Sequence, residues 1–215
     1  MTQMVRVHNF TVSKDGYAAG EGQSLERPFG HADPAVLLRW AAGTASWPNR
    51  TDPGGSRGLD DYLVRDFDRN IGAEIMGRNK FGPLRGPWAD EEEWQGWWGQ
   101  EPPFHTPVFV MTHHARPSLT LSDTTFHFVS GDPGAVLKLA LEAADGKDVR
   151  LGGGANTVRQ FLDAGLIDTL HVAVAPVELG AGSRLWLSPD ELLDRYRCDV
   201  LPSRNGVVHH LFWRE

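Results

Sequence analysis

The residues that are most clearly suited to binding a ligand form a glycine turn between a strand and a helix. Val149 to Leu151 is a short apolar strand, Gly152-Gly153-Gly154 follows it, and a helix runs from about Ala155 to Ala164. A helix N-terminus presents unpaired backbone N–H groups and a partial positive charge, and glycines let phosphate oxygens approach those groups closely. The turn therefore indicates either a pyrophosphate cradle or simply a tight turn.

The spacing around this turn differs from the common nucleotide-binding motifs. The third glycine of the usual dinucleotide fingerprint would fall at position 157, which is Thr157. The only Gly-Lys pair, Gly146-Lys147, is followed by Asp148 and not by the Ser or Thr of a P-loop. The pattern therefore disfavours an ordinary doubly wound dinucleotide domain.

Two more polar clusters follow predicted strands. Met76 leads into Gly77-Arg78-Asn79-Lys80, and a second strand ends at Thr112-His113-His114, with Arg116 shortly after. Arg binds phosphate through two parallel hydrogen bonds, whereas Lys acts as a point charge. Each cluster alone is also typical of a solvated loop. Ligands bind at the carboxyl ends of parallel strands, so the three strand ends are expected to converge on one site.

Other chemistries have weaker support. Gly54 to Gly58 fits the letters of a nucleophile elbow but lies in a turn-rich loop without a preceding strand. Adjacent histidines, His113-His114 and His209-His210, point to opposite faces of a strand, which argues against a shared metal. The single cysteine, Cys198, lies in a strand-like stretch and is interpreted as a small buried hydrophobe.

The elements that must position these residues alternate between strands and helices. An Asp-Pro pair predicts two helix starts, at residues 33–34 and 132–133, and Asn-Gly at residues 205–206 predicts a closing hairpin. This alternation predicts an α/β fold with a largely parallel sheet and an antiparallel edge. The expected strands cover about residues 5–13, 73–76, 107–112, 124–129, 149–151, 168–175, 196–201 and 207–213. The expected helices start near residues 34, 60, 133, 155 and 189, and the second of them runs to about Asn70.

The composition limits the class of protein. The 215 residues suffice for a packed core, and the formal net charge of -7 gives no global electrostatic case for nucleic acid or an anionic membrane. One cysteine excludes an internal disulfide framework. The N-terminal stretch lacks the apolar segment of a signal peptide, and no apolar run is long enough to span a bilayer. A cytoplasmic protein with no metal, membrane or nucleic-acid partner is expected.

A long irregular segment, residues 82–106, carries four tryptophans, Trp88, Trp94, Trp97 and Trp98, among acidic residues, Gly and Pro. A structureless segment of that length inside a compact domain is usually functional or ordered by a partner. The tryptophans suit a core lid, a surface on which a ligand stacks, or an interface, and the sequence does not choose among these.

The order of these motifs resembles the dihydrofolate reductase superfamily, and within it the branch with the reductase domain of bacterial riboflavin biosynthesis. The resemblance rests on four motifs from Val5 to Trp213: residues 11–19 (TVSKDGYAA), 76–78 (MGR), 152–155 (GGGA) and 166–182 (LIDTLHVAVAPVELGAG). It covers nearly the whole chain, residues 1–215, which is expected to be a single domain with a Trp-rich insertion at about 82–106.

The resemblance implies a three-layer fold with a mostly parallel eight-stranded sheet and an antiparallel C-terminal hairpin. It also implies NADPH as the hydride donor and a homodimer. Gly77, Arg78 and Lys80 would face the adenosine phosphates, and Thr112 and His113 would lie near the 2′-phosphate. The remaining implied cofactor-binding residues are Ala18 at the nicotinamide, and Gly152, Gly153, Gly154, Ala155 and Asn156 at the pyrophosphate.

Two acids are candidates for handling the proton. True dihydrofolate reductases carry a helix acid that hydrogen-bonds the pteridine, and counting back from Met76 reaches Asp61. A first-turn acid favoured by the helix dipole explains Asp61 equally. Asp15 is a second candidate. Arg65 stands where folate enzymes have an apolar or aromatic residue, and Lys80 stands where they usually have Thr.

The resemblance therefore implies an NADPH-dependent reductase of a small pterin- or ribosylaminopyrimidine-like heterocycle. One alternative is a non-catalytic nucleotide sensor or structural dimer that uses the same pocket. Another is a flavin- or deazaflavin-binding protein. The deaminase half that accompanies many riboflavin reductases is absent from this sequence, because it has no P-C-x-x-C motif.

Overall fold

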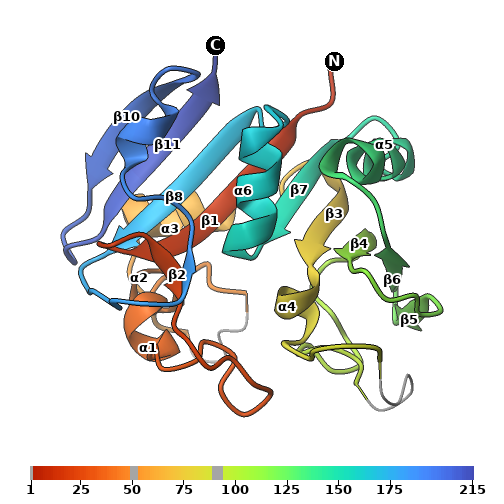
Figure 1. The fold of residues 1–215 in the computed structure, drawn as a ribbon. Helices are drawn as coiled ribbons and strands as arrows, with labels where there is room; N and C mark the ends of the chain where they lie inside the picture. The colour runs from red at the N-terminus through yellow and green to blue at the C-terminus, as the bar shows by residue number, and fades with distance from the viewer. Residues whose placement is uncertain (1, 49–52, 89–93) are drawn as a thin grey trace.

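The computed structural model describes residues 2–48, 53–88 and 94–215. Its centre is a nine-stranded sheet in the order β10-β11-β8-β1-β7-β3-β4-β6-β5 (Figure 1). The strands are β1 (Val5–Ser13), β3 (Ile71–Gly77), β4 (Pro107–Met111), β5 (Leu119–Leu121), β6 (Thr124–Val129), β7 (Asp148–Gly153), β8 (Thr169–Ala175), β10 (Tyr196–Pro202) and β11 (Val208–Arg214). Two short strands, β2 (Tyr17–Ala19) and β9 (Ser183–Arg184), pair separately.

The central part of the sheet is parallel and its two edges are antiparallel. Strands β8, β1, β7, β3, β4 and β6 pair in parallel, whereas β10 and β11 form the C-terminal hairpin and β5 pairs antiparallel to β6. The predicted fold class is therefore confirmed. The eight expected strands are present, and β5 adds a ninth strand at the sheet edge that the sequence did not predict.

Helices flank both faces of the sheet (Figure 1). They are α1 (Pro34–Leu37), α2 (Arg39–Ala42), α3 (Leu59–Arg65), α4 (Arg78–Phe81), α5 (Pro133–Ala143), α6 (Ala155–Asp163) and the 3₁₀ turn η1 (Pro189–Leu192). Both Asp-Pro starts are confirmed, since Asp33 caps the N–H of Ala35 and Asp132 caps that of Ala135. The helix predicted to reach Asn70 ends at Arg65, and Asp66 to Asn70 form a turn.

Alternation along the strands divides the core into two faces. Val172 of β8 and Ile75 of β3 belong to the large cluster covered by α5 and α6. The neighbouring residues Ala173 and Met76 face the other way, and there separate clusters cover the sheet. One cluster is built from α2 and α3, one from α1, and one from α4 and the Trp-rich segment.

No helix among the described residues is long and apolar enough to cross a membrane.

Two coverings lie on the second face, on either side of the central strands: the layer of α1 to α3, and the Trp-rich segment (Figure 1). The space between these two coverings positions the candidate site.

Candidate active site

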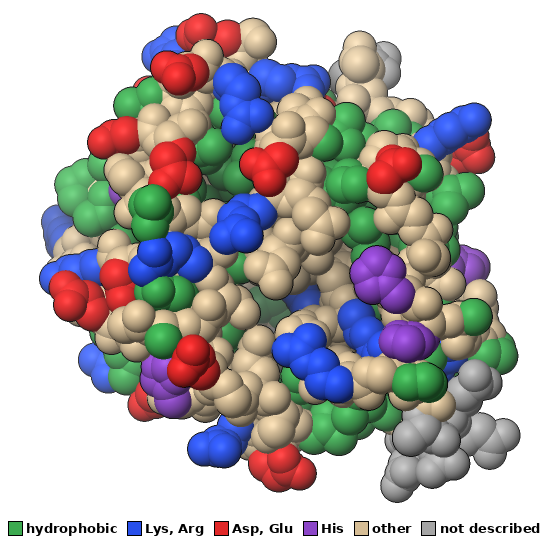
Figure 2. All heavy atoms as spheres, in the orientation of Figure 1, with side chains coloured by type: hydrophobic (Ala, Val, Ile, Leu, Met, Phe, Trp, Pro, Cys, Tyr) green, Lys and Arg blue, Asp and Glu red, His purple; other side chains and the backbone are tan. Residues whose placement is uncertain are grey.

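A cavity of about 880 Å³ lies between the two coverings of the second sheet face. Figure 2 shows this hollow with Lys, Arg and His side chains around its rim. Its walls come from β1, α1, the α3 region, α4, the Trp-rich segment, the end of β4 and the start of α6. Segments that are far apart in the sequence therefore build one site.

The predicted glycine turn forms one end of the cavity. Gly154 is the N-cap of α6 and no side chain caps this helix end. A Cβ on Gly154 would meet nothing within 4 Å, whereas a Cβ on Gly152 would lie 2.2 Å from Glu74 Oε1. Gly154, Ala155 and Asn156 line the cavity. The uncapped N–H groups of α6 therefore face space in which an anion fits without displacing protein atoms.

Arg78, on the opposite wall of this end, has unsatisfied hydrogen-bonding capacity. Its Nε and Nη2 atoms are buried without a hydrogen-bond partner among the described residues. The guanidinium carbon lies 4.0 Å from the Trp88 ring centre, which fixes the side chain by a cation–π contact. Burial, followed by repulsion from Arg85, lowers the pKa of Arg78. An anionic ligand would supply the missing acceptor and would offset both the burial of the guanidinium and its repulsion from Arg85.

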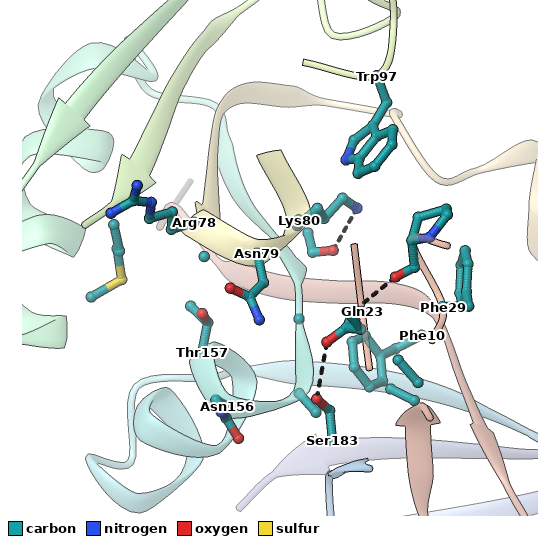
Figure 3. Close-up of a pocket in the computed structure, with 18 of the residues that line it drawn as sticks. Phe10, Gln23, Phe29, Arg78, Asn79, Lys80, Trp97, Asn156, Thr157 and Ser183 are labelled. Carbon is teal, nitrogen blue, oxygen red and sulfur yellow. Dashed lines mark hydrogen bonds between the residues drawn. The ribbon is translucent and has the colours of Figure 1, made fainter. Parts of the chain in front are cut away.

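Lys80 lies between the first glycine of this turn and the aromatic part of the cavity lining. Figure 3 shows Lys80 near Trp97, with Phe10 and Phe29 nearby, whereas Arg78, Asn156 and Thr157 lie toward the glycine end. Lys80 Nζ donates to the carbonyl oxygen of Gly152 over 2.6 Å. The structure therefore turns the Lys80 side chain inward, and its implied placement among the adenosine phosphates stays a prediction.

An ion pair lies beneath Lys80. Arg150 of β7 donates to Glu74 Oε2 of β3, with a distance of 2.8 Å from Nε, and Glu74 is buried. The second carboxylate oxygen, Glu74 Oε1, has no hydrogen-bond partner among the described residues. Burial lowers the pKa of Lys80, Glu74 opposes this effect and Arg150 adds to it.

Strand β1 supplies the floor of the cavity through His8 and Asn9. Burial, with the charges of Arg6 and Arg150, lowers the pKa of His8 from 6.5 to about 4, so its ring is neutral at neutral pH. Asn9 has a φ of 56° and its N–H lies 3.2 Å from His171 Nδ1. A positive φ is uncommon for a residue other than glycine, and residues with this conformation cluster at functional sites.

Behind Asn9 a chain of buried side chains reaches α3. His171 Nε2 lies 3.0 Å from His209 Nδ1, and His209 Nε2 lies 2.9 Å from Asp60 Oδ1. Burial lowers the pKa of both histidines, although Asp60 partly opposes this for His209. Trp40 packs edge-on against both rings. This chain holds Asn9 in place from the side of the second sheet face that α2 and α3 cover.

The structure brings most of the predicted cofactor residues together. Of the eleven, Gly153 is the exception, because it lies in β7 behind the cavity wall. The ten that line the cavity are Ala18, Gly77, Arg78, Lys80, Thr112, His113, Gly152, Gly154, Ala155 and Asn156.

The two candidate acids lie outside the cavity lining. Asp61 is buried in α3 and its Oδ1 accepts the N–H of Ser46 over 2.8 Å, so it anchors the loop before α3. Asp15 accepts hydrogen bonds from Ser13 and from the N–H groups of Leu179 and Gly180. Burial raises the pKa of Asp15, but these hydrogen bonds outweigh it and the pKa is lowered overall. Both carboxylates hold neighbouring backbone in place, and their catalytic roles stay predictions.

Sequence reasoning did not identify several residues of the cavity. His8 and Asn9 place two polar residues side by side within β1, which was an available signal for them. Arg150 follows Val149 in a buried strand and carried the same signal. Other side chains come from loops and from the short strand β9, whose approach to the cavity no local pattern encodes: Gln23, Phe29, Trp47 and Ser183.

The sequence of the chain matches the model of a known family. The family model described as the RibD C-terminal domain matches residues 6–204. The chain therefore belongs to the RibD C-terminal domain family, as the motif order predicted.

Individual relatives are distant. The chain is 29% identical over 72 residues to the uncharacterized protein YyaP of Bacillus subtilis (strain 168), a match that covers 34% of this chain and only 38% of YyaP. A putative riboflavin biosynthesis protein from Shewanella sp. PV-4 has a TM-score of 0.56 at 20% identity, covering 100% of this chain and 99% of that one. A dihydrofolate reductase from Enterococcus faecalis, complexed with NADP(H), has a TM-score of 0.51 at 12% identity, covering 99% and 96%. These structures are similar in fold.

Proposed function

We propose that this protein is an NADPH-dependent reductase that transfers a hydride to a small pterin- or ribosylaminopyrimidine-like heterocycle. The observation that carries the proposal is the pairing of the uncapped N-terminus of α6 with Arg78 across one end of the cavity. Both groups require an acceptor that the described residues do not supply. A phosphorylated dinucleotide supplies several such acceptors at once.

The residues present fit this cofactor. Gly154 leaves open space where a Cβ would otherwise approach a phosphate, and the unpartnered Arg78 atoms suit a 2′-phosphate. His113 and Thr112 line the same wall. When bound, NADPH supplies a hydride to the acceptor. The protein's tasks are to hold the nicotinamide against the acceptor, exclude water and manage one proton.

The aromatic end of the cavity suits the acceptor. Phe29, Trp97 and Phe104 line it together with Lys80. The cavity volume of about 880 Å³ has room for the acceptor beside the nicotinamide end of the cofactor. Flat heterocycles stack favourably on aromatic rings. Trp97 and Trp98 of the Trp-rich segment line this end, which favours a covering role for that segment over a purely structural one.

Two measurements test the proposal. Calorimetric titration is expected to show NADPH binding at least tenfold tighter than NADH, because only NADPH brings the phosphate that Arg78 lacks. An NADPH-oxidation screen with dihydrofolate and the ribosylaminopyrimidine of riboflavin synthesis is expected to show turnover. Tight NADPH binding without oxidation by any acceptor would favour the nucleotide sensor, and no binding of either cofactor contradicts the proposal. The homodimer implied by the family resemblance stays a prediction.

A further inference from the structure

Lys80 occupies an unusual position for a lysine. It lies in α4, directly after β3, and its side chain donates to the carbonyl oxygen of Gly152 in β7 within the cavity lining (Figure 3). Such a fixed inward placement is unfavourable for a lysine, because the side chain loses conformational entropy and the ammonium loses hydration. A single carbonyl acceptor leaves N–H groups of the ammonium for a bound molecule.

The surroundings leave Lys80 with the surplus charge. Glu74 and Arg150 neutralise one another, so the three ionised groups together carry one net positive charge. A Cβ on Gly152 would stand 2.2 Å from Glu74 Oε1 and 3.3 Å from Lys80 Nζ. Gly152 therefore makes room for the carboxylate and the ammonium to approach the same point, and the negative charge of Glu74 favours the protonated form of Lys80.

Burial and Arg150 act in the opposite direction. Both lower the pKa of Lys80, with burial the larger effect, while Glu74 raises it. His8 on β1 also faces this region but is neutral, since its own pKa is about 4. An ammonium whose pKa is lowered from its ordinary value is a better proton donor near neutral pH than a surface lysine.

The described part of the cavity lining contains no carboxylate, and His113 and His114 lie on the wall assigned to the cofactor phosphates. Among the described residues that line it, none is Asp or Glu, and both Asp15 and Asp61 are engaged elsewhere. Arg78 and Arg85 hold their protons too firmly to donate them. A ring edge rich in N–H donors would find no carboxylate partner here, whereas a carbonyl oxygen or imine nitrogen finds Lys80.

We propose that the Lys80 ammonium is the proton donor of the reduction, and that the substrate is a flat heterocycle presenting a carbonyl oxygen or imine nitrogen to it. This inference rests on the proposed reductase function. The hydride of NADPH forms a bond to the substrate carbon, and the π pair of the C=O or C=N bond moves to its oxygen or nitrogen. That atom takes the proton from Lys80 as the Nζ–H bond breaks. NADPH becomes NADP⁺, and Lys80 is left as a neutral amine that regains a proton from water.

Three variants test the role of Lys80 with whichever acceptor the screen identifies. Lys80→Met keeps the length of the side chain without its proton, and is expected to lower kcat about a hundredfold or more. Lys80→Arg keeps the charge but cannot donate, so it should not restore kcat. Glu74→Gln removes the charge that raises the pKa of Lys80, so the alkaline fall in kcat is expected to move to lower pH. Lys138→Met, at an exposed position in α5, is the matched control.

The readouts separate the possible failures. NADPH affinity, measured by calorimetry on the same samples, should change less than threefold in Lys80→Met, which shows that the variant is folded. If wild type oxidises NADPH and Lys80→Met matches its kcat across pH, the proton-donor role is overturned while the reductase function stands. If none of the tested acceptors supports NADPH oxidation by the wild type, the reductase function fails and this inference fails with it. An NMR titration that gives Lys80 the pKa of a surface lysine would also overturn the proposal.

Discussion

At the scale of single residues, the glycines of the β7–α6 turn have different tasks. Gly152 has no room for a side chain, because its Cβ would clash with Glu74 Oε1 at 2.2 Å. Gly154 has room, since nothing lies within 4 Å of its Cβ position. Gly152 is therefore required by the fold, whereas Gly154 has no such requirement and leaves space for a ligand.

This difference gives a matched pair of variants. Gly152→Ala is expected to lower the free energy of unfolding by about 2 kcal/mol, because a buried carboxylate must move. Gly154→Ala is expected to change it by less than about 1 kcal/mol, yet to weaken NADPH binding about tenfold, because the methyl group occupies the phosphate space. Urea unfolding and calorimetry measure the two effects. Unchanged NADPH affinity in a folded Gly154→Ala variant would contradict the assigned cradle.

At the scale of elements, one buried polar chain joins β1, β8, β11 and α3. Asn9 donates its N–H to His171, which can donate to His209, which can donate to Asp60. Neutral histidines with the proton on Nε2 satisfy every one of these contacts. Asp60 also accepts from Ser203 Oγ and Asn205 Nδ2 beside the hairpin turn. The chain thus ties the C-terminal hairpin to the strand under the site.

This chain predicts a pH dependence of stability. His8, His171 and His209 all have lowered pKa values in the folded protein, whereas the unfolded chain has the ordinary histidine value of about 6.5. Below that pH the unfolded chain binds more protons, so the free energy of unfolding is fully retained above about pH 6.5 and falls as the pH drops toward the folded values. For His8 alone the loss by about pH 4 is on the order of 2–3 kcal/mol.

Urea unfolding at pH 7.5, 6 and 5 measures this loss, and Asp60→Ala extends the test. Removing Asp60 leaves the His209 Nε2–H without its acceptor, so the free energy of unfolding should fall by roughly 1–3 kcal/mol at pH 7.5. A free energy of unfolding that is flat from pH 7.5 to pH 5 would show that the histidines are not held neutral.

The elements also show what sequence reasoning can and cannot reach. The Asp-Pro caps, the Asn-Gly hairpin and the glycine turn are local signals, and the structure has each of them at the expected residues. The acid Asp61 was chosen by counting along the chain, but its orientation depends on how the loop at Ser46 packs, which is a tertiary property. The inward direction of Lys80 depends on the missing side chain of Gly152, 72 residues away.

At the scale of the whole molecule, the cavity is the meeting place of segments from across the chain. His8 lies near the N-terminus, Arg78 and Trp97 lie in the middle, and Asn156 and Ser183 follow in the last third. No single element contains the site, so a bound molecule contacts both coverings of the second sheet face. Ligand binding is therefore expected to stabilise the folded chain as a whole.

The size of this effect follows from mass action. At a free NADPH concentration one hundred times Kd, the folded state gains about 2.7 kcal/mol, which for a chain of this length raises Tm by roughly 5–10 °C. NADH at the same concentration should give a smaller shift, since it lacks the phosphate that Arg78 requires. Gly154→Ala should lose most of the NADPH shift, and Lys80→Met should keep it, because Lys80 is assigned to the acceptor. Thermal scans should use one protein concentration throughout, because the Tm of the predicted homodimer would itself rise with protein concentration. Equal shifts with NADPH and NADH would remove Arg78 from cofactor selection.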